Sequence, residues 1–373
     1  MGKEKILVAM SGGIDSSMAA HRLLQAGYEV VGVTMRLFEE PAAAAAPANG
    51  QAPCCSHRHY QDARNVAAAL GIRHYLVNYR DDFRQRVITP FVETYLKGLT
   101  PSPCILCNTL IKFSKLRRFA HCLGIRRIAT GHYARTQFDE ITQRHLLLRG
   151  RDGQKDQSYF LFDLEQEQLQ DVVFPLGDLT KREIREQAAA AGLPVAEKAE
   201  SQEICFVPDG DYASFINRFV DEEKLDAPAP PGDIVLKDGT VVGRHEGIHR
   251  YTVGQRRGLG IALGYPTYVI GLRPAQNQVV VGRPEDIYAR RFRITRCNWI
   301  AIPSLDEAID ATVKIRSRFQ PAAVEIRPCG DNGAEVTFRE PQPSITPGQA
   351  AVFYWDDVVV GGGWIYRIEP ESA

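Results

Sequence analysis

The sequence predicts an α/β protein that begins with a doubly wound parallel sheet, continues through a small central domain and ends in a β-barrel. Three observations lead to this fold class. In the first half of the chain, short apolar segments alternate with amphipathic segments long enough for helices, which favours parallel strands covered on both faces. From about residue 206, short alternating segments with Gly-rich turns follow, as is typical of antiparallel barrels. The length of 373 residues also suggests two or three domains.

The first half contains the predicted parallel strands. Residues 5–9 (KILVA) form an apolar run of the kind found in buried strands, and an amphipathic helix follows until Gly27. A second strand is predicted at 29–35. The later segments of this pattern are a helix at 62–71, a strand at 73–79, a helix at 115–124 and a strand at 126–134. Such sheets bind ligands at the carboxyl ends of their strands, where we expect the functional site.

Changes of composition mark the predicted domain boundaries. Residues 39–53 form a low-complexity Ala/Pro-rich insertion, in which Pro41, Pro47 and Pro53 prevent a continuous helix. After residue 206 come one short helix and a Pro-rich linker. The boundaries predicted in this way are a catalytic domain at 1–205, a central domain at 206–285 and a barrel at 286–373.

The composition limits the possible partners and location. Lys plus Arg and Asp plus Glu each number 45, so the net charge indicates neither nucleic acid nor a membrane surface, and an anionic partner must bind to local basic patches. No run approaches the roughly 18 to 20 apolar residues that a membrane-spanning helix needs, and the N-terminus does not resemble a signal peptide. We therefore expect a cytoplasmic protein whose 8 cysteines are reduced, catalytic or metal-binding.

The turn Ser-Gly-Gly-Ile-Asp-Ser at 11–16 connects the first predicted strand to the first helix. A helix N-terminus presents unpaired N–H groups and a partial positive charge, so it can hold an anion without a lysine. Gly12 and Gly13 allow a phosphate to approach closely, and Asp15 could hold Mg²⁺ or fix the turn. The pattern is neither G-x-x-x-x-G-K-[ST] nor G-x-G-x-x-G. The alternative is a plain strand-to-helix connection that Asp15 and Ser16 cap.

Cysteines form a second set of candidate residues. Cys104 and Cys107 make a C-x-x-C before a predicted helix, which suits redox chemistry, metal ligation or a nucleophile of low pKa. A zinc site would require a second matching pair, which the sequence lacks, and the adjacent Cys54 and Cys55 make a poor chelate. Cys205 lies in ESQEICFVPDG, where it is either reactive or a buried inert thiol.

Several motifs follow one another along nearly the whole chain, interrupted only by the insertion. They are SGGIDSS, TPSPCILCN, IKF, ATGHYA, LLRGRDGQKDQSYFL, SQEICF, YTVGQRRGLG, TPGQAAVFY and GGGWI. This combination and order resembles the tRNA-specific 2-thiouridylase (MnmA) family within the PP-loop ATP pyrophosphatases. The resemblance implies a PP-loop (HUP-like) catalytic domain, a small central domain and a C-terminal β-barrel that contacts tRNA.

The resemblance also implies a reaction. ATP adenylates the 2-oxygen of the wobble uridine in tRNA and releases pyrophosphate, and sulfur from a cysteine persulfide then displaces AMP to give 2-thiouridine. By motif match, Cys205 carries the persulfide and Cys107 acts with it. The positions that match the ATP site, with Mg²⁺, are Ala9, Met10, Ser11, Gly12, Gly13, Ile14, Asp15, Ser16, Met35 and Gly131. The positions that match tRNA contacts are Ser102, Pro103, Cys104, His132, Lys155, Asp156, Gln157, Arg316, Ser317 and Gln349.

The expected partners follow from this reaction. The tRNA would bind through its anticodon stem-loop with the target base flipped into the pocket, and clusters of Lys and Arg on all three predicted domains fit an RNA backbone. A sulfur-carrier protein or a cysteine desulfurase would supply the sulfur. We expect neither a membrane nor DNA as a partner. The sequence does not indicate which tRNAs are used, nor the oligomeric state.

Cys104 departs from the family pattern. The best-known members have Asp three residues before the first catalytic cysteine, and a thiol with a pKa of about 8.5 replaces a carboxylate poorly. One alternative is a [4Fe–4S] cluster on Cys104, Cys107 and Cys205 with one iron open to sulfide; no other metal site is expected. Two other functions stay open: a PP-loop ligase for a small molecule, and a tRNA- or metal-binding module with a vestigial ATP site. The paired cysteines and the barrel speak against the first, and the intact turn against the second.

Overall fold

The computed structural model describes residues 2–38, 57–196, 198, 204–207, 210–225 and 230–369. The predicted insertion at 39–53 and the pair Cys54 and Cys55 lie outside the described residues. The chain forms two compact units. The first unit comprises Met1–Ile88, Pro103–Gly210 and Asp357–Val359, and the second comprises Thr89–Ser102, Asp211–Asp356 and Val360–Ala373. No helix in the described ranges is long and apolar enough to cross a membrane.

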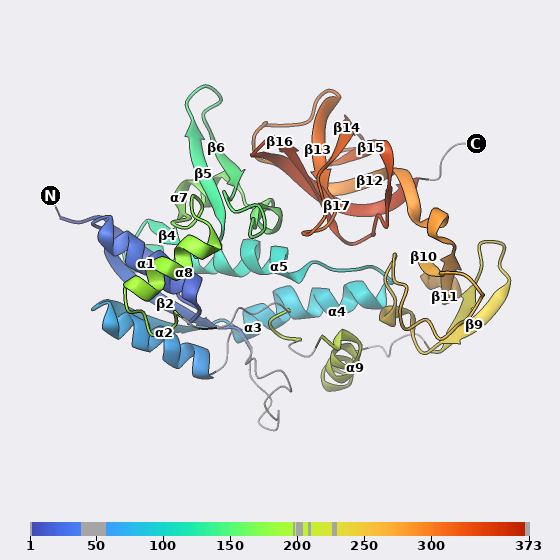
Figure 1. Ribbon diagram of the computed structural model, residues 1–373, viewed down its shortest axis with the longest axis horizontal. Helices are drawn as coiled ribbons and strands as arrows, with labels where there is room; N and C mark the ends of the chain where they lie inside the picture. Colours follow the sequence, from blue (N-terminus) through green and yellow to red (C-terminus); the bar gives the residue numbers. More distant parts are fainter. Residues whose placement is uncertain are drawn as a thin grey trace. The chain divides into compact units, whose positions relative to one another are not determined.

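The first unit contains a parallel sheet with the strand order β3-β2-β1-β4-β7 (Figure 1). Its strands are β1 (Lys5–Ala9), β2 (Glu29–Arg36), β3 (Arg73–Asn78), β4 (Arg127–Ala129) and β7 (Val172–Val173). In the β1–β2 register Leu7 lies opposite Val31, and in the β1–β4 register it lies opposite Ile128. The predicted doubly wound parallel sheet is confirmed, although β4 is shorter than the strand predicted at 126–134.

Three helices share one apolar core with the first strand. They are α1 (Ile14–Gln25), α2 (His57–Ala69) and α8 (Lys181–Ala190), and α1 and α8 lie side by side (Figure 1). Ile6 and Val8 of β1 point into this core together with Met18 of α1, Val66 of α2 and Ile184 of α8. Because strand side chains alternate, Leu7 points to the opposite face and is also fully buried. The sheet is therefore covered on both faces, as a parallel sheet requires.

The other elements of the first unit include two π-helical turns. They are α3 (Arg80–Phe83), the π-helix η1 (Arg84–Ile88), α5 (Pro103–Leu106), the π-helix η2 (Cys107–Lys112), α6 (Lys115–Cys122), the hairpin β5 (Ala134–Asp139) and β6 (Arg144–Arg149), the 3₁₀ turn η3 (Ser158–Leu161) and α7 (Gln166–Asp171). The N–H of Phe113 donates to the carbonyl of Asn108, five residues back, at 2.8 Å, which is the π-helical pattern.

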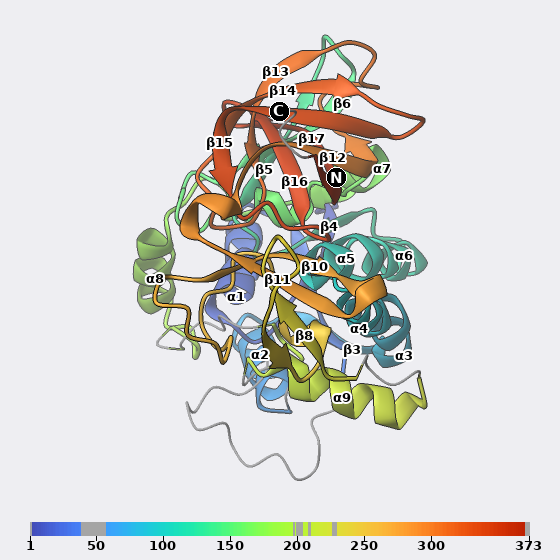
Figure 2. The same cartoon turned by 90° about the vertical axis from the view of Figure 1, so that its right-hand side faces the viewer.

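The second unit contains a closed antiparallel barrel. Its strands are β12 (Tyr288–Trp299), β13 (Ile309–Lys314), β14 (Ala322–Pro328), β15 (Gly333–Pro343), β16 (Ala350–Trp355) and most of β17 (Val358–Glu369). They follow the order β12-β15-β14-β13-β16-β17, and β12 also pairs with β17, which closes the ring (Figure 2). Phe292, Val336, Phe338 and Phe353 fill the interior. The predicted C-terminal barrel is confirmed.

A smaller sheet and two helices complete the second unit. The sheet has the order β10-β11-β8-β9, and its core contains Ile234, Val269 and Val279. The bounds of these elements are β8 (Gly232–Val235), β9 (Val241–His245), η4 (Ile248–Arg250), β10 (Tyr268–Arg273), η5 (Pro274–Gln276), β11 (Gln278–Gly282), η6 (Pro284–Ile287), α4 (Thr89–Leu96) and α9 (Tyr212–Glu223). The rings of Tyr95 and Tyr212 stack at 4.6 Å, which joins α4 to α9.

A buried histidine lies beside the small sheet. His249 is 2% exposed, and neither ring nitrogen has a hydrogen-bond partner among the described residues. Burial, with smaller contributions from the positive charge of Arg250 and from His245, lowers the pKa of His249 to about 4. The folded state therefore holds His249 neutral at pH values where the unfolded chain protonates it.

This histidine predicts a loss of stability in mild acid. Keeping His249 neutral has no cost above pH 6.5, where the unfolded chain is neutral as well. The cost grows as the pH falls from 6.5 towards 4, and at pH 5 it should lower the free energy of unfolding by about 2 kcal/mol. His249→Phe removes the titrating group. Between pH 7 and pH 5, the free energy of unfolding of the variant, measured in urea, should therefore fall by about 2 kcal/mol less than that of the wild type. An equally steep fall in the variant would contradict the assignment.

Candidate functional site

The turn after β1 leaves the start of α1 open. The N–H of Met10 donates to the carbonyl of Val33 at 2.8 Å, and Gly13 is the N-cap residue of α1. The hydroxyls of Ser16 and Ser17 donate back to the Gly13 carbonyl at 3.1 and 2.9 Å, and no described side chain caps the helix. The first N–H groups of α1 therefore remain available to an anion.

Two glycines allow the backbone around this turn to pack closely. Gly12 has a φ of 71°, and a Cβ there would lie 2.1 Å from the carbonyl oxygen of His59 in α2. A Cβ at Gly131 would lie 2.7 Å from the carbonyl carbon of Asp15 and 2.8 Å from the nitrogen of Ser16. The segment after β4 thus packs directly on the first turn of α1, and no other residue fits at either position without a shift of backbone.

A lysine from α8 pairs with the aspartate of the turn. The Nζ of Lys181 donates to both carboxylate oxygens of Asp15, at 2.7 and 2.8 Å, and the hydroxyl of Tyr133 donates to Oδ1 at 2.8 Å. Lys181 is 8% exposed and is the first residue of α8, whose start is fixed by a capping box of Thr180 and Glu183. The carboxylate of Asp15 thus links the first turn of α1 to the start of α8 and to Tyr133.

A second lysine reaches the same turn from the segment after α8. The Nζ of Lys198 donates to the carbonyl of Gly12 at 2.9 Å and to the carboxylate of Asp62 in α2 at 2.5 Å. Each lysine neutralises a carboxylate beside the turn, Lys181 that of Asp15 and Lys198 that of Asp62. These acidic side chains therefore do not cancel the positive potential of the first N–H groups of α1.

The other predicted ATP-site residues lie at the same edge of the sheet. The hydroxyl of Thr34 donates to the carbonyl of Met10 at 2.7 Å and is 2.9 Å from Nε2 of His74, so the end of β2 is tied to the turn. Met35 follows Thr34, and Gly131 follows β4. The structure thus gathers Ala9–Ser16, Met35 and Gly131 at the carboxyl ends of the neighbouring strands β2, β1 and β4.

The predicted catalytic cysteines belong to the first unit. Cys104 is exposed on α5, whereas Cys107, the first residue of η2, is 7% exposed. Cys205 is half-buried in the described turn 204–207, and the ring of the next residue, Phe206, packs edge-on against Phe83 at 5.7 Å. Phe83 belongs to α3, and α3 packs on η2. The turn with Cys205 is therefore anchored to a helix that contacts the helix of Cys107.

Cys104, Cys107 and Cys205 are not grouped as metal ligands in the part of the chain that the structure describes. Within the described ranges, which include Cys104, Cys107 and Cys205, no three His, Cys, Asp or Glu side chains lie close enough to hold a metal ion. The three-cysteine arrangement that a [4Fe–4S] cluster needs is absent from these positions.

Some predicted tRNA contacts are engaged within the first unit. Asp156 accepts from the N–H groups of Gly150 and Ser158 at 3.2 and 3.0 Å, and Gln157 accepts from the N–H of Tyr133 at 3.0 Å. These side chains shape the turn that presents Lys155. His132 bonds the hydroxyl of Thr130 through Nδ1 at 2.7 Å, and burial together with Lys112 lowers the pKa of His132 well below its ordinary value. His132 is thus neutral at pH 7.

The remaining predicted tRNA contacts lie in the second unit or at its end. Arg316 is exposed, with its guanidinium 5.2 Å from the ring centre of Phe319, and Ser317 follows it after β13. Ser102 is largely buried. The side-chain amide of Gln349 donates to two backbone carbonyls of the segment before Ser102. Pro103, which begins α5 in the first unit, is buried.

Three family models together match most of the chain. Residues 4–209 match the family described as "tRNA methyl transferase HUP domain", residues 217–283 the "tRNA methyl transferase PRC-barrel domain" and residues 289–365 the "Aminomethyltransferase beta-barrel domain". A protein of Koribacter versatilis named tRNA-specific 2-thiouridylase MnmA is 49% identical over 97% of this chain and 99% of its own length. Proteins of the same name from Solibacter usitatus and Moorella thermoacetica are 47% and 49% identical, over 98% and 97% of this chain and 100% and 99% of their own.

The chain belongs to the tRNA-specific 2-thiouridylase family. The likeness to solved structures is lower: a 4-thiouridine synthetase in a complex with RNA and ATP is 16% identical, has a TM-score of 0.35 and covers 59% of this chain and 51% of that chain. The resemblance predicted from the motifs is therefore confirmed by relatives that span the full chain.

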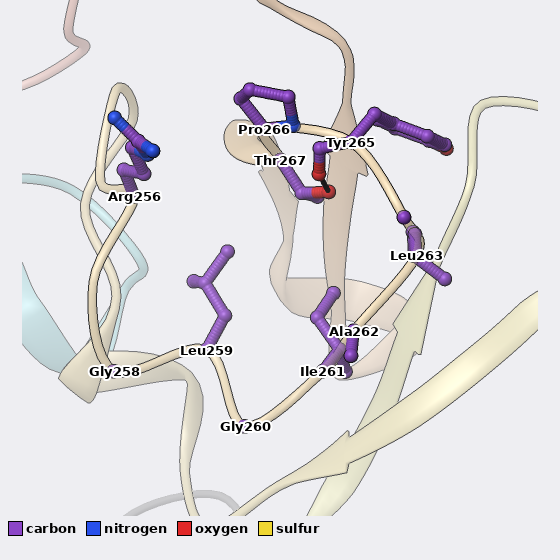
Figure 3. Close-up of a pocket in the computed structure, with 11 residues that line it drawn as sticks. Arg256, Gly258, Leu259, Gly260, Ile261, Ala262, Leu263, Tyr265, Pro266 and Thr267 are labelled. Carbon is purple, nitrogen blue, oxygen red and sulfur yellow. Dashed lines mark hydrogen bonds between the residues drawn. The ribbon is translucent and has the colours of Figure 1, made fainter.

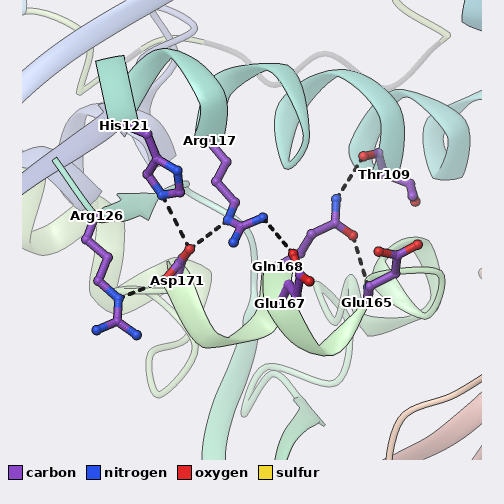
Figure 4. Close-up of polar contacts among 8 residues, drawn as sticks. All are labelled: Thr109, Arg117, His121, Arg126, Glu165, Glu167, Gln168 and Asp171. Carbon is purple, nitrogen blue, oxygen red and sulfur yellow. Dashed lines mark hydrogen bonds and ion pairs between the residues drawn. The ribbon is translucent and has the colours of Figure 1, made fainter. Parts of the chain in front are cut away.

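Two basic residues of this 2-thiouridylase family member are already paired. Asp171 accepts from Arg117 at 2.6 Å and from Arg126 at 3.2 Å, and the ring of His121 lies 3.5 Å away (Figure 4). These residues line a hollow of about 400 Å³. Glu167 lies 3.3 Å from Arg117. Arg117 thereby joins α6 to α7, and Arg126 joins the segment before β4 to α7. Because both side chains are paired within the protein, they are poor candidates for contacts to RNA phosphates.

A second hollow, of about 560 Å³, lies within the Gly-rich loop 256–267 of the central sheet (Figure 3). The loop is pinned internally, since the hydroxyl of Thr267 donates to the carbonyl of Tyr265 at 3.0 Å. Arg283 stacks over the ring of Tyr265 at 4.2 Å. Nothing in its lining matches the predicted site residues.

The sequence motifs do not identify four residues around the turn: Lys181, Lys198, Tyr133 and Asp62. Lys181 and Lys198 lie 166 and 186 residues from their partners Asp15 and Gly12. Lys181 begins a helix that has a capping box, and in the sequence it is indistinguishable from a surface residue. Only the fold identifies these residues as members of the site.

The ion pair of Lys181 predicts a large effect on phosphate binding. Lys181→Met leaves the carboxylate of Asp15 uncompensated where a polyphosphate would bind, and one charge-assisted hydrogen bond contributes about 1.5–3 kcal/mol. The affinity for ATP, measured by calorimetry, should fall about 10- to 100-fold.

Two further variants control this experiment. Lys237→Met removes the surface pair with Asp286 and should bind ATP like the wild type. Asp15→Asn combined with Lys181→Met removes both charges and should bind better than Lys181→Met alone. Wild-type affinity in Lys181→Met would show that the pair plays no part in binding the phosphates.

Proposed function

We propose that this protein is an ATP-dependent tRNA sulfurtransferase that replaces the 2-oxygen of the wobble uridine with sulfur, giving 2-thiouridine, AMP and pyrophosphate. The observation that carries the proposal is the turn at α1, which two lysines surround and which belongs to the same compact unit as Cys107 and Cys205. The family relatives, all named tRNA-specific 2-thiouridylase, support it over nearly the full chain.

The phosphates of ATP would bind to the open N-terminus of α1. The N–H groups of its first turn would supply the positive potential, while Lys181 and Lys198 neutralise the nearby carboxylates of Asp15 and Asp62. Gly12 and Gly131 allow the neighbouring backbone to pack closely around the turn. Mg²⁺ commonly binds through substrate phosphates with few protein ligands, so we propose that it arrives with ATP. Met35 and Ala9 flank this position at the strand ends and would contact the nucleoside.

Adenylation solves a chemical problem of the substrate. The 2-carbonyl of uracil is a poor electrophile because both ring nitrogens donate electrons into it, and its oxygen is a poor leaving group. Attack of this oxygen on the α-phosphorus releases pyrophosphate and converts the oxygen into part of an AMP ester. Carbon 2 then carries a leaving group that a sulfur nucleophile can displace.

The two cysteines would carry out the sulfur transfer. The terminal sulfur of a Cys205 persulfide attacks carbon 2, and AMP leaves with the original oxygen. The Cys107 thiolate then attacks the inner sulfur of Cys205, so that the S–S bond to the uridine sulfur breaks and a Cys107–Cys205 disulfide forms. A thiol reductant restores both cysteines, and a sulfur-carrier protein or a cysteine desulfurase reloads Cys205.

We propose the persulfide route rather than a [4Fe–4S] cluster, because the described cysteines do not gather as a metal-ligating group. Cys104, which is exposed on α5 three residues before Cys107, would take the place of the acid–base residue. His132, neutral at pH 7 because its pKa is lowered, would contact a base or ribose of tRNA rather than pair with a phosphate.

The proposal also assigns roles to the domains and to the tRNA contacts. Residues 1–205 would form the catalytic domain, 206–285 the central domain and 286–373 a tRNA-contacting barrel. Ser102, Lys155, Arg316 and Ser317 would contact the anticodon stem-loop, whose target base flips out of its stack. The enzyme would act in the cytoplasm, where its tRNA substrate is found.

Thiolation of unmodified tRNA with ATP and a sulfur donor tests this function. Cys107→Ser and Cys205→Ser should abolish the thiolated product, which a mercury-containing gel retards, because each removes an obligatory sulfur. Cys104→Ala should lower kcat by about a hundredfold, as expected for loss of an acid–base group, and Cys104→Asp should restore it.

Cys122→Ala is the matched control, since Cys122 is also exposed but lies on α6. It should thiolate tRNA like the wild type. Full activity of Cys107→Ser or Cys205→Ser would contradict the mechanism, and an iron-dependent activity lost in Cys104→Asp would favour the cluster instead.

A further inference from the structure

The chain crosses from the second unit to the first directly before the helix with the candidate cysteines. Residues 89–102 belong to the second unit together with the barrel, whereas α5 and η2 belong to the first. Cys104 and Cys107 lie two and five residues beyond Ser102, the last residue of this excursion. Because the peptide chain is continuous, the position of Ser102 constrains where α5 can begin.

A barrel side chain holds the excursion just before it ends. The Nε2 of Gln349 donates to the carbonyl of Thr100 at 3.1 Å and to that of Pro101 at 2.9 Å. The N–H of Thr100 donates in turn to the carbonyl of Pro347 at 2.9 Å. Three hydrogen bonds thus join the segment 100–101 to the loop before β16, all of them within the second unit.

The loop that carries Gln349 is itself fixed. The N–H of Gly348 donates to the carbonyl of Ile365 at 2.8 Å, and the N–H of Ile365 donates to the carbonyl of Gln349 at 2.9 Å. Gly348 has a φ of 93°, and a Cβ there would lie 2.7 Å from both the nitrogen and the oxygen of Thr100. The excursion therefore rests on a rigid part of the barrel.

The amide of Gln349 has two different ends. Its nitrogen is directed at the two carbonyls, so both of its hydrogens are used within the protein. Its Oε1 has no hydrogen-bond partner among the described residues, and the side chain is only half-buried. This oxygen can accept a hydrogen bond from a base N–H or a 2′-hydroxyl of RNA, but not from a phosphate.

We infer that Gln349 is a positioning residue for Cys107. By holding the carbonyls of Thr100 and Pro101, it fixes the start of α5, the helix that leads to Cys107, and keeps Cys107 protected. RNA that binds to Oε1 changes the hold on this segment, and so connects substrate binding at the barrel to the reactivity of the cysteine. The inference rests on the proposed function for the identity of the RNA and of the reactive cysteine. Besides any contact to RNA, Gln349 then has the role of positioning the start of α5.

Alkylation of Cys107 tests this role without tRNA or ATP. Gln349→Met keeps the shape of the side chain but loses the donors, so the labelling rate of buried Cys107 by iodoacetamide should rise about tenfold, measured by peptide mass spectrometry with Cys122 as internal standard. Gln349→Lys restores donors without the carbonyl oxygen, and its labelling rate should stay near that of the wild type. Gln349→Glu replaces the Met variant if that variant does not fold by circular dichroism.

Kinetics of thiolation supply the second measurement. Gln349→Met should lower kcat about tenfold in addition to any change in KM for tRNA, because the cysteine helix is misplaced even when tRNA is bound. The matched control is Gln342→Met, whose amide donates only to the carbonyl of Glu340 on its own strand and whose loss should change neither quantity.

The possible outcomes separate this inference from the proposed function. Unchanged labelling and kcat in Gln349→Met, with only KM raised, would overturn the inference and leave Gln349 as a simple RNA contact. Failure of Gln349→Lys to restore slow labelling would also overturn it. If the wild type did not thiolate tRNA at all, the proposed function would fail, whereas the labelling experiment would still decide the role of Gln349.

Discussion

The ion pair of Asp15 and Lys181 is the interaction on which the rest of the site depends. An aspartate in the first turn of a helix is favourable for the helix dipole, but it puts a negative charge at the proposed phosphate site. Lys181 cancels this charge through both carboxylate oxygens, and Tyr133 holds one of them. Because Lys181 is buried, its desolvation offsets much of the attraction, and the pair stabilises folding little. Its contribution is to leave the helix terminus available and positive.

The pair also joins segments that are far apart in the chain, since Asp15 lies in the first turn of α1 and Lys181 begins α8. Tyr133 follows the close contact of Gly131 with α1, and its backbone holds Gln157 in the turn that presents Lys155. On the other side, the π-helix that begins at Cys107 interrupts regular α-helical spacing, a feature common at functional sites. The proposed phosphate site and the candidate cysteines thus lie on short segments of one compact unit.

Much of this site could be predicted from the sequence, because its motifs are local. The Ser-Gly-Gly turn, the strand before it and the C-x-x-C each lie within a few residues, so periodicity and glycine content suffice. Lys181 and Lys198 could not be found in this way, since their partners lie more than 160 residues away. The excursion of residues 89–102 into the second unit was also missed, because α4 has the composition of any amphipathic helix. Domain boundaries read from composition assume continuous segments, and this chain crosses between units several times.

The fate of the uridine 2-oxygen tests the central claim most directly. Adenylation makes this oxygen part of AMP. When the substrate is tRNA labelled with ¹⁸O at carbon 2 of the wobble uridine, one labelled AMP should therefore be released for each 2-thiouridine formed. Mass spectrometry of the released AMP measures this ratio. Unlabelled AMP beside thiolated tRNA would show that the oxygen leaves by another route, and would contradict the account in which the turn at α1 activates the base for attack by sulfur.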